Sequence, residues 1–115
     1  MTPNLKPSEP LSQVVFIHDY LQLIFQDEGF NIYNLAEVEV HGVKSMQGQP
    51  GFCDAVVSLI GQRITAASHS DKCALKLLFE EGAQIVVRND GEAIRGPESF
   101  EFNGRNQLPV VEQND

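Results

Sequence analysis

A repeated pattern constrains the fold of this chain more than any other feature. Residues 21–33 return in similar form at residues 75–86 when Glu28 is left out of the first copy. The identical pairs are Leu21/Leu75, Leu23/Leu77, Phe25/Phe79, Gly29/Gly82 and Ile32/Ile85. Alternating apolar residues on both sides of a glycine predict a strand, a tight turn and a return strand. We therefore expect two related β-hairpins, each with its glycine in the turn.

Further strands are predicted where short apolar runs alternate with polar residues. Such runs occupy residues 14–17, 37–41, 64–68 and 99–102. The dipeptide Asn103-Gly104 follows the last of them and favours a type I′ turn, with a return strand beyond it. Short connections of this kind demand antiparallel pairing.

One segment changes from the period of a strand to that of a helix. Phe52, Val56, Leu59 and Ile60 form one apolar stripe, and Gly61 follows where a helix often ends. We predict a helix over about residues 51–60. The fold class is then α+β and mostly antiparallel β, with the two hairpin units in a curved sheet or half-open barrel beside this single short helix.

Prolines set the N-terminus apart from the rest of the chain. Pro3, Pro7 and Pro10 predict a flexible arm over residues 1–12, followed by a single β-rich domain over residues 13–112. The arm has no apolar stretch like that of a signal peptide, and no run of about 18 apolar residues occurs anywhere. We expect a cytoplasmic protein that does not enter a membrane.

The charge balance is strongly acidic. Sixteen acidic residues oppose eight lysines and arginines, which gives a net charge of −8. This sign disfavours nucleic acid and anionic membrane surfaces as partners and favours a basic protein. A simpler explanation is that the charge keeps a small protein in solution.

Four acidic residues lie at the two predicted hairpin tips. They are Asp27, Glu28, Glu80 and Glu81. If the hairpins lie side by side, these carboxylates form one acidic edge that could enter a basic cleft of a partner. Glu37 and Glu39, on a predicted exposed strand, are the next candidates. The alternative is that the tips are polar only because turns are solvated.

A second candidate site is the polar interruption His18-Asp19-Tyr20. An imidazole held by a carboxylate can act as a base, and Cys53 near the predicted helix start is a candidate nucleophile. The alternatives are a strand bend whose Asp19 side chain satisfies backbone donors, and a cysteine that fills space in the core.

We expect neither a metal nor a cofactor. The candidate ligands are His18, Asp19, His41, Cys53, His69 and Cys73. They contain no close pair such as CxxC or HxxxH, which zinc sites normally use. The glycines at residues 48–51 are not followed by the lysine and hydroxyl residue of a phosphate-binding loop.

The stretch from Leu59-Ile60-Gly61 through the next strand to the pattern Leu75-x-Leu77-x-Phe79-x-x-Gly82 resembles small uncharacterised bacterial β-rich proteins. The resemblance covers most of residues 14–88 and implies a fold without functional residues. In size, acidity and β-rich character the chain is also similar to bacterial immunity proteins, which neutralise a toxin.

Three hypotheses follow. The first is a non-enzymatic protein that binds a basic partner, as an inhibitor or immunity-type protein does. The second is a homodimeric structural domain that packs one sheet face against its twin. The third is a small-ligand binder or an enzyme that uses His18, Asp19 and Tyr20.

Overall fold

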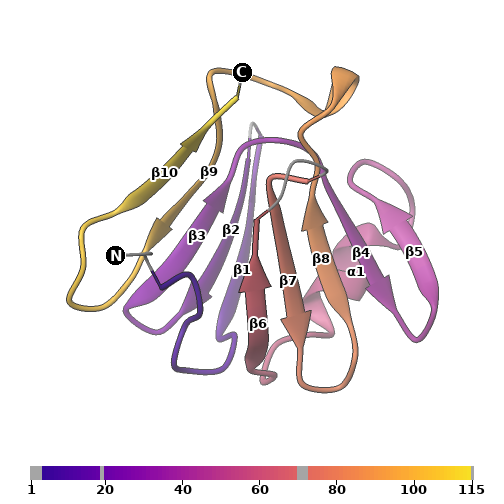
Figure 1. Ribbon diagram of the computed structural model, residues 1–115. Coiled ribbons are helices and arrows are strands. Elements are labelled where there is room, and N and C mark those ends of the chain that lie inside the picture. The colour runs from indigo at the N-terminus through magenta and orange to yellow at the C-terminus, as the bar shows by residue number, and fades with distance from the viewer. Residues whose placement is uncertain (1–3, 19, 70–72, 115) are drawn as a thin grey trace.

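The computed structural model describes residues 4–18, 20–69 and 73–114, which form two five-stranded antiparallel sheets (Figure 1). The order in sheet A is β1 (Gln13–Ile17), β2 (Tyr20–Phe25), β3 (Glu28–Ile32), β9 (Glu98–Asn103) and β10 (Val110–Gln113). The order in sheet B is β5 (Val43–Met46), β4 (Ala36–Val40), β8 (Gln84–Val87), β7 (Leu75–Phe79) and β6 (Ile64–Ser68). A helix, α1 (Phe52–Val57), and a 3₁₀ turn, η1 (Gly91–Ala93), complete the described fold. The predicted α+β class, mostly antiparallel β, is confirmed, and the described strands form two sheets and no closed barrel.

The two halves of the chain exchange hairpins. Strands β1, β2 and β3 start sheet A, but the hairpin that follows them, β4–β5, joins sheet B by pairing with β8. Likewise β6, β7 and β8 start sheet B, and the next hairpin, β9–β10, joins sheet A by pairing with β3. Each sheet therefore consists of a three-strand meander from one half and a hairpin from the other.

The repeated sequence accounts for the meanders. The predicted hairpins are confirmed as β2–β3 and β7–β8. The repeated leucines and phenylalanines of β2 and β7 all face inward, with at most 2% of their surface exposed. The duplication thus places the same apolar stripe at equivalent positions of the two sheets.

The predicted role of Gly29 in the first turn is wrong. Gly29 lies inside β3 opposite Ile24, and the residue with left-handed backbone is Gln26, with φ of 62°. In the second hairpin Gly82 does lie in the turn, with φ of 93°. The reason is loop length: Phe25 pairs directly with Glu28, whereas the amide of Phe79 donates to the carbonyl of Ala83 across a longer loop. Glu28 is therefore the counterpart of Ala83.

The turn predicted at Asn103-Gly104 is also wrong. Asn103 is still part of β9 and pairs with Gly29, and the chain returns only at Val110, which pairs with Phe102. The longer loop carries Arg105 back to the first hairpin tip. The dipeptide Asn103-Gly104 alone does not indicate the longer loop, because it is the pairing of β9 with β3 that extends the strand through Asn103.

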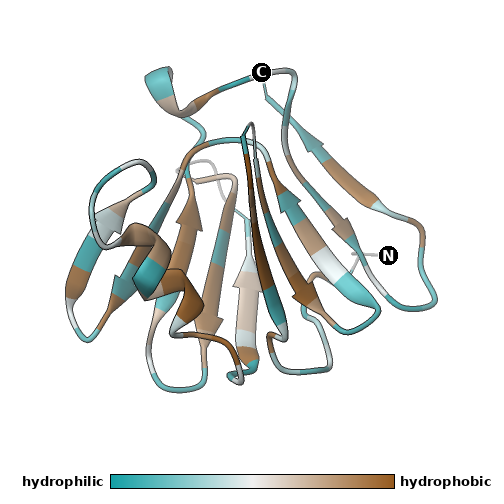
Figure 2. Cartoon of the chain, turned by 180° about the vertical axis from the view of Figure 1, so that it is seen from behind, coloured by the Kyte–Doolittle hydropathy of each residue, from teal (hydrophilic) through white to brown (hydrophobic). Residues whose placement is uncertain are grey.

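One aromatic side chain lies at the centre of the sheet A side of the core. The ring of Phe30 lies 4.5 Å from that of Phe102, 6.2 Å from that of Phe25 and 6.4 Å from that of Phe100, measured between centroids. Phe30 is 1% exposed. Along the strands, apolar and polar residues alternate between this core and the outer faces, as the hydropathy colours show (Figure 2).

The helix is shorter than predicted. It ends at Val57, and a turn follows in which the amide of Leu59 donates to the carbonyl of Val56. Phe52, Val56 and Leu59 are buried, whereas Ile60 is 44% exposed and does not belong to the stripe. The helix packs against β4 and β5. It therefore covers the inner side of sheet B near its β5 edge.

The described part of the N-terminal segment is attached to the domain. Leu11 is 1% exposed, its amide donates to the carbonyl of Gln62, and its carbonyl accepts from the amide of Gly61. These bonds join the segments that lead into β1 and β6. The mobility of residues 1–12 stays a prediction.

Candidate functional site

The first hairpin tip is engaged within the molecule. Arg105 Nη2 lies 2.6 Å from Asp27 Oδ1, and Arg105 Nε lies 3.1 Å from Asp27 Oδ2. Both side chains are largely exposed, and the hydrogen bond from Arg105 holds the pKa of Asp27 below its usual value. The charge of Asp27 is therefore largely compensated before any partner arrives.

Glu28 lies beside this pair but is buried, with 6% of its surface exposed. Its Oε1 accepts hydrogen bonds from the amide and hydroxyl of Ser8, and its Oε2 accepts one from the amide of Arg105. Burial opposes ionisation, but these donors outweigh it and lower the pKa of Glu28. Glu28 thus joins the N-terminal segment and the β9–β10 loop to β3.

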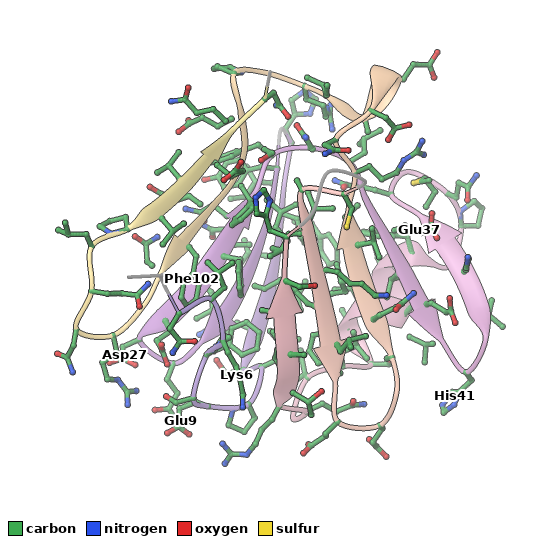
Figure 3. All side chains as sticks on the ribbon, viewed as in Figure 1. Lys6, Glu9, Asp27, Glu37, His41 and Phe102 are labelled. Atoms are coloured by element: carbon green, nitrogen blue, oxygen red, sulfur yellow. The ribbon has the colours of Figure 1, made fainter. Side chains whose placement is uncertain are left out.

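The remaining predicted binding residues do not gather with these two. Glu80 and Glu81 are exposed at the second tip, between β7 and β8, which lies at the same end of the fold as the first (Figure 1). There Glu80 Oε1 accepts a hydrogen bond from the amide of Arg63. Glu37 and Glu39 lie on the outer face of sheet B, and Figure 3 shows Glu37 far from Asp27. The six carboxylates are therefore spread over several surfaces.

The described members of the alternative pocket do not all lie together either. Asp19 lies outside the described residues. Tyr20 opens β2 on the outer face of sheet A, and Cys53 lies exposed on α1, which packs on sheet B. His18 is exposed at the end of β1. Cys53 thus lies apart from His18 and Tyr20, which lie on either side of the β1–β2 turn.

The structure reveals a polar row across sheet A that the sequence did not indicate. Gln22, Asn31 and Glu101 occupy directly paired positions of β2, β3 and β9 on the outer face. Gln22 Nε2 donates to Asn31 Oδ1 at 2.9 Å, and Asn31 Nδ2 donates to Glu101 Oε1 at 3.0 Å. These bonds fix three half-buried side chains in one orientation each.

A tyrosine pair lies beside the polar row. The ring centroids of Tyr20 and Tyr33 are 5.4 Å apart, and both side chains are half-buried. Burial, together with the nearby carboxylates of Glu101 and Glu98, raises the pKa of the Tyr33 phenol. Tyr33 therefore remains a neutral phenol at physiological pH and links the polar row to the neighbouring cleft.

That cleft has a volume of about 300 Å³. It is lined by Tyr33, Arg95, Gly96, Pro97 and Glu98.

Apolar side chains complete the outer face of sheet A around the polar row. They are Val15, Ile17, Ile24 and Val111, at least partly exposed. Together, the polar row, the tyrosine pair and these apolar residues are called the sheet A face below.

The sequence contained only part of the signal for this face. Tyr20, Gln22 and Ile24 can be recognised as the positions of β2 that alternate with the core leucines. Asn31 and Glu101 could not be linked to them, because 70 positions separate the two residues and their contact depends on the pairing of β3 with β9.

A second cleft, of about 510 Å³, opens between the N-terminal segment and β6. Lys6, Arg63 and Glu80 contribute its charged groups. Arg63 Nη1 donates to the carbonyl of Ser8 at 2.6 Å, so this guanidinium holds the N-terminal segment in place. The opposite charge of Glu80 on the same wall weakens any attraction for an anion.

Comparisons with known proteins add no residues to the site. No protein-family model matches the chain, and neither a curated protein nor a solved structure matches it significantly. Among the described residues, no helix is long and apolar enough to cross a membrane. Within the same residues, no group of three or more histidine, cysteine or acidic side chains is placed to hold a metal ion.

Proposed function

We propose that this protein is a non-enzymatic binding domain whose sheet A face binds a basic surface of a partner protein. The observation that carries the proposal is the hydrogen-bonded row Gln22–Asn31–Glu101 next to the Tyr20–Tyr33 pair. The proposed partner keeps the character expected from the acidic composition, but the binding surface differs from the hairpin tips.

The chemistry of the sheet A face suits protein recognition. Tyrosine is enriched in interface hot spots because it offers a large apolar ring and a polar hydroxyl at low entropic cost. The amides of Gln22 and Asn31 are already oriented, so binding would immobilise few further side-chain rotamers. Apolar residues around the row can exclude water from it.

The charge of this face favours a basic partner. Glu101 belongs to it, and the outward positions of its paired strands carry neither lysine nor arginine. In the adjoining cleft Glu98 is accompanied by Arg95, so the negative charge of the face itself comes from Glu101. The whole chain has a net charge of −8, which adds a long-range attraction for a positively charged protein. Inhibition of a basic enzyme or toxin is one role that such binding can serve.

A matched pair of variants tests the proposal. Glu101→Gln removes a half-buried carboxylate of the sheet A face, and Glu39→Gln removes a comparable one, bonded to Gln84, from sheet B. Wild-type and variant proteins are used to capture partners from the organism that encodes the chain, and each captured protein is purified and titrated by calorimetry. We expect Tyr33→Ala to abolish binding of a basic protein, Glu101→Gln to weaken it, and Glu39→Gln to leave it unchanged.

Binding to the sheet A face is disproved if Tyr33→Ala and Glu101→Gln bind that protein as the wild type does. Equal losses in Glu101→Gln and Glu39→Gln would instead show that only net charge matters. Circular dichroism spectra of all variants establish that they are folded.

The cleft beside Tyr33 supports a second candidate, the binding of a small polar ligand. A phenol, the Arg95 guanidinium and the Glu98 carboxylate all line it. Screening a fragment library by NMR, with shifts followed at Tyr33 and Glu98, tests this candidate. Hits that perturb neither residue would reject it.

A further inference from the structure

The two sheets have four edge strands, and three of them carry features that discourage pairing with another chain. β6 has an irregular register between Ile64 and Ala66, and β10 has one between Glu112 and Gln113. β10 also contains a charge, at Glu112, and follows Pro109. β5 is four residues long and contains Lys44.

β1 has none of these features. Its five residues pair with β2 in unbroken register, and they include no charge, no proline and no glycine. Among the described strands, β1 pairs with β2 alone. Phe16 is 44% exposed although it lies opposite the fully buried Leu21, and Ile17 is 36% exposed. A regular, apolar, uncharged edge of this kind is a template for another strand.

We infer that β1 pairs antiparallel with β1 of a second copy of this chain, so that two copies of sheet A form one continuous ten-stranded sheet. A twofold axis near Phe16 sets Val15 of one copy opposite Ile17 of the other. The edge is complementary to itself because β-branched and aromatic side chains meet with no like charges opposed.

The surroundings of β1 favour a second copy over an unrelated strand. The bonds between Leu11 and residues 61–62 tie the segment just before β1 to the segment just before β6, so the end of β1 is the part of the edge farther along the chain from this junction. A short twofold pairing centred near Phe16 uses this part of the edge twice and covers both exposed side chains. The homodimer inferred here uses a strand edge, in contrast to the sheet-face packing considered from the sequence.

Sedimentation velocity tests the inference on the full chain. Ile17→Lys places two like charges near the proposed axis, and Val111→Lys makes the same change on β10, where the valine is 39% exposed. We expect the wild type and Val111→Lys to sediment as dimers at high concentration, and Ile17→Lys to remain a monomer. Amide hydrogen exchange of residues 14–17 is expected to slow as wild-type concentration rises and to stay fast in Ile17→Lys.

A wild type that is monomeric at every concentration overturns the inference, as does a dimer that survives Ile17→Lys or is lost in Val111→Lys. The dependence on salt concentration distinguishes this self-association from binding of a basic partner. Two copies with a net charge of −8 repel, so the dimer strengthens as salt screens them, whereas attraction to a basic protein weakens.

Discussion

The guanidinium of Arg105 and the carboxylate of Asp27 form a two-bond ion pair across 78 positions of sequence. The pair fastens the β9–β10 loop to the turn between β2 and β3. It replaces the free acidic tip expected from the sequence by a neutral contact between segments from the two halves of the chain.

We expect Asp27→Asn to lower the melting temperature only slightly. Both partners are largely exposed, so solvent screens the pair, and ordering two side chains offsets part of the attraction. Thermal unfolding at low and high salt measures the effect, which shrinks with salt. Asp90→Asn is the control, because it breaks a pair with Arg88 of similar geometry that joins residues only two positions apart. A loss that does not depend on salt would contradict the electrostatic explanation.

Glu28→Gln is expected to destabilise the fold more than Asp27→Asn does. The buried carboxylate accepts three hydrogen bonds, and leaving such a group partly unmatched costs about 1–3 kcal/mol. Urea denaturation at neutral pH measures the loss. Equal stability of the two variants would show that the bonds from Ser8 and Arg105 contribute little.

The stabilisation by Glu28 is expected to depend on pH in one direction. Its pKa is lower in the folded protein than its usual value of 4.5, so the ionised form favours folding. The stabilisation is complete above pH 4.5 and is lost as the pH falls through the folded-state pKa. The stability difference between wild type and Glu28→Gln is therefore expected to narrow in acid. A stability difference that grows in acid would mean that folding raises the pKa of Glu28 and does not lower it.

His41→Asn is expected to stabilise the protein. His41 and Gly42 have φ of 53° and 78°, which is the pattern of a type I′ turn between β4 and β5. Asparagine tolerates this backbone better than histidine, and we expect a gain of about 0.5 kcal/mol. Gly42→Ala is the opposing control, with an expected loss of about 1–2 kcal/mol. Among the described residues, no atom lies within 4 Å of the Cβ that alanine would add, so this loss measures the backbone strain alone. Chemical denaturation gives both values, and a destabilised His41→Asn would assign His41 a role beyond the turn.

Phe30→Ala is expected to cost about 3–5 kcal/mol, because it opens a cavity among Phe25, Phe100 and Phe102. Phe16→Ala removes the same side chain from a site that is 44% exposed, and in dilute solution we expect a loss of about 1 kcal/mol or less. Denaturant midpoints compare the two. Similar losses would mean that the aromatic cluster is not the packing centre of sheet A.

The inner face of the fold could be predicted from the sequence, because a strand with one buried side must alternate. Leu21, Leu23 and Phe25 show this, as do their counterparts in β7. The turn positions could not be predicted with equal success. Gly29 and Asn103 look like turn residues in isolation, yet they pair with each other inside sheet A.

The candidate binding surface depended still more on pairing between distant segments. Glu101 reaches Asn31 only because β9 crosses to the other half's meander, and a linear sequence carries no signal for that choice. The acidic tips are recognisable in the sequence, but in the folded protein Asp27 is bonded to Arg105 and Glu28 to Ser8, so these carboxylates are already engaged.

The exchange of hairpins between the halves has a consequence for how the protein is made. When a ribosome has completed β4 and β5, the other partner of β4, β8, has not yet been synthesised, and β9, the partner of β3, is synthesised later still. The nascent chain must therefore keep the edge of β4 unpaired until β8 emerges and the edge of β3 unpaired until β9 emerges. Folding then depends on contacts between remote segments, which slows it and makes it concerted over nearly the whole chain. A chain truncated before β9 would therefore leave β3 without its second partner strand in sheet A.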